Sequence, residues 1–265
     1  MPRLSDLFEI PAPYDSGPPR FVMSLHKSGS TMANNLLQGV FRSNRVPFIN
    51  MPTRFFNDGL KDADWSNDSS IALAVRDGIV YTGFRYLPNC LCETIRERSL
   101  AILVVRDPRD ALVSAFFSFG PKGSHVLPRN SAEATARMLE SRKPDEGITI
   151  DEWVLKRAAT VRAKLEEYST VVRNSNFRLF KYEEILFSKR AFVLDALEHL
   201  AISCEADSVD QACAKHHIIP SREDPTKHIR KALPGDHREK LQAETIDELN
   251  RQFKKTMETF GYELG

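Results

Sequence analysis

Short apolar runs alternate with amphipathic stretches along most of the chain. The first run, at 21–25, is of the buried-strand type and leads into a polar turn at 26–31. Further strands are predicted at 79–83, 101–105 and 177–181, of which the run at 101–105 is rich in β-branched residues. Because strands that alternate with helices form parallel sheets, we expect an α/β fold with a mostly parallel central sheet flanked by helices.

Helices are predicted from apolar positions that recur every three or four residues. One helix follows the polar turn and carries its apolar face at Met32, Leu36, Leu37, Val40 and Phe41. A second begins near Pro108, which suits a first helical turn, and a third opens with capping-box spacing at Thr149 and Glu152. Two more are expected near 189–201 and 236–260.

Proline and glycine mark the irregular parts of the chain. Residues 1–19 form an irregular N-terminal lead-in, so we expect a single domain at 20–265. Residues 120–148 are polar, contain several glycines and prolines, and resemble in part a mobile loop that could act as a lid.

Composition narrows the functional classes. The chain has 265 residues, 42% of them hydrophobic and 28% charged, and a formal net charge of +1, so it is an ordinary globular protein. This charge favours neither a nucleic-acid binder nor a membrane-surface binder. No run reaches the roughly 18 apolar residues of a transmembrane helix.

Four cysteines are too few for a disulfide scaffold and predict a cytoplasmic protein. The spacing of Cys90, Cys92, Cys213, His216 and His217 matches no standard zinc pattern, so we expect no metal site.

The polar turn after the first strand has the composition of a phosphate-binding loop. Gly29 lets the backbone approach an anion, Lys27 adds a charge, and Ser28, Ser30 and Thr31 add hydroxyl groups. A Walker A loop places glycine directly before the lysine, whereas Lys27 precedes Gly29, so no magnesium ligand is implied. The alternative is an ordinary strand-to-helix turn with a surface lysine.

A second basic cluster follows the strand at 101–105. Arg106 lies at the strand end and Ser114 lies inside the next helix, so both could contact one small anion. The alternative is an Arg–Asp network that joins the strand to the helix. Because both clusters follow the carboxyl ends of predicted strands, we expect them at one edge of the sheet.

Together these motifs resemble those of the sulfotransferases that use 3′-phosphoadenosine 5′-phosphosulfate (PAPS). The phosphosulfate loop of that family matches residues 27–31, and its arginine followed eight positions later by serine matches Arg106 and Ser114. Its Tyr-Glu segment matches residues 181–184, and its late basic stretch matches residues 228–236. The matches occur in the family's order.

The resemblance implies a P-loop-like sulfotransferase fold, PAPS as co-substrate, adenosine 3′,5′-bisphosphate (PAP) as product, and no metal. It also implies roles for individual residues. The 5′-phosphosulfate would be held by Lys27, Ser28, Gly29, Ser30 and Thr31, and Met32 would also belong to the cofactor site. The 3′-phosphate would be held by Arg106, Ser114, Arg230 and Lys231, and Tyr182 would line the adenine pocket.

Several positions depart from the family pattern. His26 replaces a proline, and Met32 stands where cytosolic members often have tryptophan. Ala232 replaces a glycine in the late basic stretch, and His237 occupies a position often filled by tryptophan. The histidine that acts as the base in cytosolic members is matched by Tyr86.

We therefore expect Lys27 as the chief electrostatic catalyst, with assistance from Arg85, and His125 as the candidate general base. Asp58, His26 and Tyr86 are the alternative bases.

The acceptor should contact residues within 43–100 and 120–150. An aromatic wall with a basic rim is predicted from Arg54, Phe55, Phe56, Trp65, Phe84 and Tyr86. It would suit a small-molecule, lipid or carbohydrate acceptor. Two other functions stay open: a non-catalytic binder of adenosine bisphosphate or sulfated glycans, and an ATP-dependent P-loop kinase. The sequence does not predict an oligomeric state.

Overall fold

The computed structural model describes residues 4–123, 127–216, 231 and 233–264. Five strands form one sheet, in which every neighbouring pair is parallel and the order is β2-β3-β1-β4-β5. The strands are β1 (Arg20–Ser24), β2 (Phe48–Ile49), β3 (Val80–Phe84), β4 (Leu100–Val105) and β5 (Phe177–Lys181). The expected α/β fold with a parallel central sheet is confirmed.

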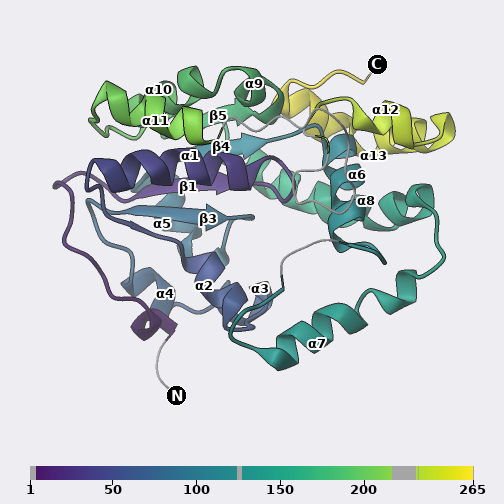
Figure 1. Cartoon of the computed structure of the whole chain (residues 1–265), viewed down its shortest axis with the longest axis horizontal. Helices are drawn as coiled ribbons and strands as arrows, with labels where there is room; N and C mark the ends of the chain where they lie inside the picture. Colours follow the sequence, from purple (N-terminus) through teal and green to yellow (C-terminus); the bar gives the residue numbers. More distant parts are fainter. Residues whose placement is uncertain (1–3, 124–126, 217–230, 232, 265) are drawn as a thin grey trace.

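Helices cover both faces of the sheet (Figure 1). The first half of the chain contains α1 (Ser30–Ser43), α2 (Met51–Asn57), α3 (Asp62–Trp65), α4 (Ser70–Leu73), α5 (Cys92–Glu97) and α6 (Pro108–Phe119). The second half contains α7 (Ala132–Glu140), α8 (Ile150–Ser169), α9 (Tyr182–Phe187), α10 (Lys189–His199), α11 (Ala206–Lys215), α12 (Asp236–Lys240) and α13 (Ala243–Phe260). Short 3-10 turns lie at Leu4–Leu7, Asn89–Leu91 and Lys143–Asp145.

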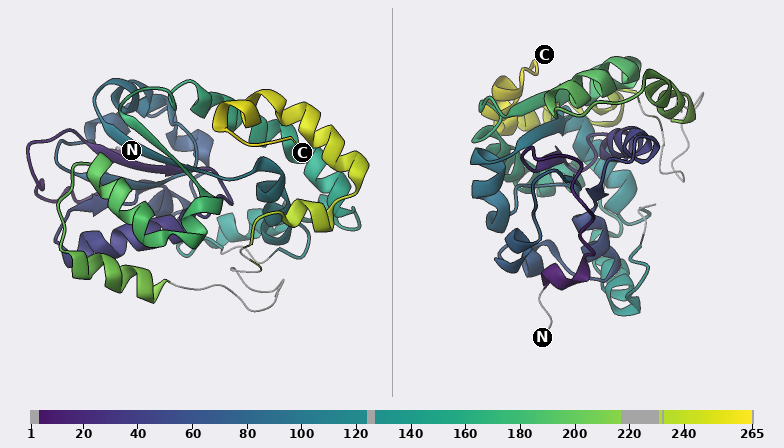
Figure 2. Two further views of the ribbon diagram at one scale, coloured as in Figure 1. Left: turned by 90° about the horizontal axis from the view of Figure 1, so that it is seen from above. Right: turned by 90° about the vertical axis from the view of Figure 1, so that its left-hand side faces the viewer.

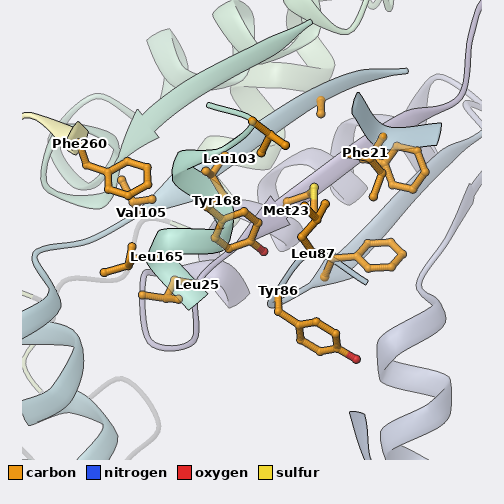
Figure 3. Close-up of a cluster of buried hydrophobic side chains, with 14 of the residues drawn as sticks. Phe21, Met23, Leu25, Tyr86, Leu87, Leu103, Val105, Leu165, Tyr168 and Phe260 are labelled. Carbon is orange, nitrogen blue, oxygen red and sulfur yellow. The ribbon is translucent and has the colours of Figure 1, made fainter. Parts of the chain in front are cut away.

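Alternate residues of the central strands point into two separate cores. Val22 of β1 packs with α1, α10 and α11, whereas its neighbours Phe21 and Met23 pack with the helices of the opposite face. On that opposite face α13 lies along α8 (Figure 2). Figure 3 shows part of this core, including Met23, Tyr168 and Phe260. Burial on both sides explains why the strands are continuous apolar runs.

Element boundaries differ from the sequence expectations in a few places. The expected helix at 236–260 is two helices, because the backbone is extended at Leu241 and Gln242. The segment 120–148 is not only a loop, since it contains α7 and a 3-10 turn. Strand β2 was missed because two residues carry no periodic signal. Within the described part of the chain, no helix is long and apolar enough to cross a membrane.

The lead-in is attached to the domain. Residues 8–19 form no helix or strand, yet Phe8 packs edge-on against Phe55 with ring centroids 5.3 Å apart. Asp15 pairs with the buried Arg20 at 2.6 Å. The domain boundary near residue 20 stays a prediction.

Candidate functional site

The loop between β1 and α1 is shaped for close approach by an anion. Lys27 and Gly29 have positive φ angles of 64° and 77°. Gly29 is also the N-cap of α1 and, lacking a side chain, makes no side-chain cap bond. The positive end of α1 therefore faces the carboxyl edge of the sheet without a carboxylate or hydroxyl cap at that position.

Ser28 fixes this loop to the sheet. Its hydroxyl is fully buried and lies within donor distance of the carbonyls of Leu25 (2.6 Å) and Val104 (3.0 Å). The side chain therefore has a structural role in this geometry. Ser30 is buried, whereas Met32 is partly exposed and Thr31 is exposed at the start of α1.

Tyr182 closes one side of the loop. A Cβ atom at Gly29 would lie only 2.2 Å from the Tyr182 Cδ2 atom, so the aromatic ring rests directly on the loop backbone. Tyr182 is the first residue of α9 and is buried. Only glycine allows this contact together with the left-handed backbone.

Arg106 joins the two basic clusters. Its Nη1 atom donates to the Lys27 carbonyl at 3.4 Å, and its guanidinium lies 4.5 Å from the centre of the Tyr182 ring. Its Nη2 atom is 3.5 Å from the Leu233 carbonyl and 3.7 Å from the Asp110 carboxylate. The residues expected from sequence to hold the two ends of one nucleotide are thus brought together.

These contacts leave the Arg106 guanidinium poorly satisfied. The residue is only 6% exposed, its contacts to oxygen are all at least 3.4 Å long, and its Nε atom has no hydrogen-bond partner among the described residues. Buried arginines normally have well-formed partners, so this geometry suits an additional anionic ligand. We name Lys27, Gly29, Arg106 and Tyr182 the basic edge.

Asp110 ties the late basic stretch to α6. Its carboxylate accepts hydrogen bonds from the backbone nitrogens of Gly235 (2.7 Å) and His237 (2.9 Å), and it lies 2.7 Å from His237 Nδ1. Burial opposes ionisation, but the His237 hydrogen bond and the Arg106 charge outweigh it and lower the pKa of Asp110 to about 2. The pairing of Asp110 with Arg106 agrees with the Arg–Asp network considered as an alternative from sequence, but the contacts of Asp110 with Gly235 and His237 were missed.

The other residues of the expected 3′-phosphate site are less well placed. Ser114 is partly exposed in α6, one helical turn after Asp110. The Lys231 ammonium contacts the carboxylates of Asp236 (3.3 Å) and Glu239 (2.6 Å). Arg230 lies outside the described residues.

Two of the expected catalytic cations contact hydroxyl groups at the sheet edge. Lys27 Nζ donates to Ser118 Oγ at 2.6 Å, in the last turn of α6. Arg85 donates to Ser24 Oγ at 3.0 Å, and burial lowers the pKa of Arg85 to about 10, so it stays protonated at neutral pH. Ser24 is the last residue of β1 and also accepts, through its carbonyl, the Tyr168 hydroxyl.

The candidate bases differ in their surroundings. Hydrogen bonds from Asn130 and Arg54 lower the pKa of Asp58, which weakens it as a base. Burial raises the pKa of Tyr86, so its hydroxyl stays neutral. His26 packs edge-on against the ring of Phe119, and His125 lies outside the described residues.

The expected aromatic wall is largely core. Phe55, Trp65 and Phe84 are almost fully buried and pack against one another, and Tyr86 is only 8% exposed. Arg54 is occupied by Asp58. The type of residue alone did not distinguish a ligand wall from a hydrophobic core.

Two residues of the expected wall, Phe56 and Trp65, line a cavity of about 640 Å³ between α2, α3 and α7. We name it the α7 cavity. Its lining is mainly apolar, with charged groups that include Asp62 and Arg137. Among its apolar members are Phe56, Leu60, Trp65, Pro128 and Met138.

Comparison with known proteins adds information on the fold. No protein-family model and no curated protein sequence matches the chain. Among solved structures, retinol dehydratase in complex with retinol and PAP superposes with a TM-score of 0.60, at 14% identity, over 94% of this chain and 82% of that one. Retinol dehydratase with androsterone and PAP gives 0.57, with the same identity and coverage.

Mouse sulfotransferase SULT7A1 complexed with PAP gives a TM-score of 0.60 at 12% identity, over 92% of this chain and 85% of that one. The chain has the sulfotransferase fold. The resemblance inferred from the sequence motifs is therefore confirmed for the fold. In this sulfotransferase fold the basic edge follows the carboxyl ends of the adjacent strands β1, β4 and β5.

Proposed function

We propose that this protein transfers a sulfuryl group from PAPS to a hydroxyl or amine of a small-molecule, lipid or carbohydrate acceptor. The observation that carries the proposal is the position of Arg106, which is buried between the Lys27 carbonyl and the Tyr182 ring. Its Nε atom has no partner in the part of the chain that the structure describes. A nucleotide with phosphates at both ends of its ribose has the anionic groups that such an edge attracts.

In the proposed complex, Lys27 and the backbone N–H groups at the start of α1 hold the 5′-phosphosulfate. Sulfuryl transfer resembles phosphoryl transfer, in which charge builds on the leaving oxygen during an in-line displacement. Lys27 would stabilise that charge and Arg85 would support it from the end of β3. Gly29 would allow the close approach of the 5′ group, beside Ser30, Thr31 and Met32.

At the other end, Arg106 would bind the 3′-phosphate, and Tyr182 would contact the adenine. Ser114 and Arg230 stay part of this proposal because their spacing matches the family motif. Lys231 would have to exchange its carboxylate partners for the phosphate. The Nε atom of Arg106, which has no hydrogen-bond partner among the described residues, could donate to such a phosphate.

Groups of three or more acidic, histidine or cysteine ligands suited to a metal are absent from the described residues. We propose a reaction without a bound metal, in which the protein's cations alone neutralise the phosphates. The described thiols, all unpaired, support a reducing compartment such as the cytoplasm as the proposed location.

The proposal is tested first by binding. PAP without magnesium should raise the melting temperature of the wild type. Arg106→Ala should weaken PAP binding about 10- to 100-fold, because it removes a charged hydrogen-bond donor worth about 1.5–3 kcal/mol. Arg96→Ala, at an exposed arginine that donates to Thr170 Oγ1, is the control.

The second test is catalysis. Transfer of ³⁵S from labelled PAPS to phenols, aliphatic alcohols, sugars and amines would establish the enzyme. PAP binding without transfer to any of them would indicate a non-catalytic binder. Binding that requires magnesium and favours ATP would indicate a kinase and contradict the proposal.

A further inference from the structure

Two chains of residue contacts run from the α7 cavity towards the basic edge. At one side, Ser141 lines the cavity, and the next residue, Arg142, donates to the Gly123 carbonyl at 2.8 Å. Gly123 packs against the backbone of Ser118, whose hydroxyl accepts from Lys27. The wall of the cavity formed after α7 is thus linked to the lysine proposed to stabilise the leaving group.

At the other side, the connection runs through Asp62, the first residue of α3. Its backbone carbonyl accepts from the Tyr86 hydroxyl at 3.3 Å, directly after β3. The preceding residue, Arg85, donates to Ser24 Oγ at the end of β1, just before the phosphosulfate loop. Asp62 therefore lines the cavity beside the residue that takes the place of the family's histidine.

We infer that Asp62 is the general base of the reaction, and that it accepts the proton of an alcohol or phenol whose apolar body occupies the α7 cavity. This inference rests on the proposed sulfuryl transfer. The lining of the cavity supports an apolar body, because the side chains of Phe56 and Leu60 are hydrocarbon and Met138 carries only a weakly accepting thioether.

The step balances as follows. The acceptor O–H bond breaks, its proton goes to an Asp62 carboxylate oxygen, and the oxygen lone pair forms the new S–O bond. The bond between sulfur and the bridging oxygen of PAPS breaks, and its electron pair goes to the 5′-phosphate. The products are the sulfate ester and PAP, and Asp62 later releases the proton to water.

The charges around Asp62 suit this task. Lys164 of α8 lies 4.0 Å away, Arg85 also faces it, and Lys61 and Asp64 flank it on its own helix. Arg137 and Glu140 of α7 line the same cavity.

Burial raises the pKa of Asp62, while the charge of Lys164, a hydrogen bond from Tyr86 and the charge of Arg85 oppose the rise. Because 58% of the Asp62 side chain is exposed, water limits this rise in the free protein. An apolar acceptor would displace that water and make the carboxylate a stronger base.

The experiment compares Asp62→Asn with the wild type on three acceptors of increasing acidity: 1-decanol, 2-naphthol and 4-nitrophenol. Loss of a general base should lower kcat about 10²- to 10⁴-fold for the alcohol. The loss should be smaller for 2-naphthol and smallest for 4-nitrophenol, which ionises without help. A merely structural role would lower all three rates equally.

Two variants and one further profile complete the test. Asp62→Glu should recover part of the rate, and Asp77→Asn should match the wild type because Asp77 is exposed and does not line the cavity. The wild-type kcat should fall at low pH as Asp62 is protonated, and this fall should be absent in Asp62→Asn. All variants should keep the PAP-induced shift in melting temperature.

The outcomes separate the two proposals. Asp62 is not the base if the kcat of Asp62→Asn stays within a factor of about three of the wild type, or if kcat falls equally for all three acceptors. The proposed sulfuryl transfer would still stand in either case. If the wild type labels only sugars or amines, the assignment of the cavity is wrong. If it binds PAP and labels nothing, both proposals fail.

Discussion

The basic edge and the α7 cavity are built in different ways. The basic edge follows the ends of β1, β4 and β5, three adjacent parallel strands whose register fixes the loop positions. The cavity lies between short helices, and polar contacts attach α7 to the end of α2: Arg137 donates to the Gly59 carbonyl at 3.0 Å, and Asn130 donates to Asp58 at 2.7 Å. The sheet therefore fixes the positions of the residues at the basic edge, on the proposed donor side. The shape of the α7 cavity, on the proposed acceptor side, depends on the local sequence of the helices around it.

At the basic edge, the largest effect should come from Lys27→Ala. Removing one preorganised donor to the leaving group should lower kcat at saturating PAPS about 100- to 1000-fold. Stopped ³⁵S-transfer assays measure it, with Lys122→Ala, an exposed lysine just beyond α6, as the control. Near-normal turnover of Lys27→Ala would contradict the proposed role of Lys27 in stabilising the leaving group.

The next effect concerns the backbone of the same loop. Gly29→Ala should cost about 2–5 kcal/mol of unfolding free energy, because it combines a positive φ with a clash against the Tyr182 ring. Gly147→Ala is the matched control: its φ is also positive, at 85°, but a Cβ atom would meet nothing within 4 Å, so it should cost about 1 kcal/mol. Urea denaturation compares them, and equal losses would show that the ring contact is unimportant.

A smaller effect on the free energy of unfolding should depend on pH, because Asp110 is ionised in the folded protein. Its pKa of about 2 lies below the ordinary value of 3.8, so its ionisation stabilises the fold above about pH 4 and this contribution is lost as pH falls towards 2. The contribution is on the order of 2 kcal/mol. Asp110→Asn should therefore lie further below the wild type in unfolding free energy at pH 7 than at pH 3. A gap independent of pH would contradict this assignment.

The smallest effect should come from the apolar lining of the α7 cavity. Met138→Ala should raise the KM for 2-naphthol about 3- to 10-fold, because it removes apolar contact area, and should leave PAP affinity unchanged. Leu139→Ala is the control, since Leu139 is 46% exposed on the same helix and does not line the cavity. If PAP affinity changed as well, the two regions would not be independent.

The donor side was largely predictable from the sequence. Buried parallel strands are apolar runs, and their carboxyl ends share one edge, so Lys27 and Arg106 could be expected to meet. The additional contacts of Asp110 and Ser118 could not be expected, because a carboxylate or hydroxyl inside a helix can face several directions.

The acceptor side was much less predictable. Aromatic residues such as Phe55, Trp65 and Phe84 occur both in hydrophobic cores and in ligand pockets. Only the packing in the structure shows which environment they occupy. Asp62 lies in a helix of four residues that carries no motif and no periodic pattern. The position of such a residue depends on tertiary contacts with α8 and the end of β3.

The central position of β1 also has a consequence for biosynthesis. This strand is made first, yet both its edges stay unpaired until β3 and β4, some 60 and 80 residues later, have been synthesised. A strand with an apolar centre and two unpaired edges is a site for association with other nascent chains. We therefore expect the yield of active protein in cells to depend on chaperones that shield this segment during translation.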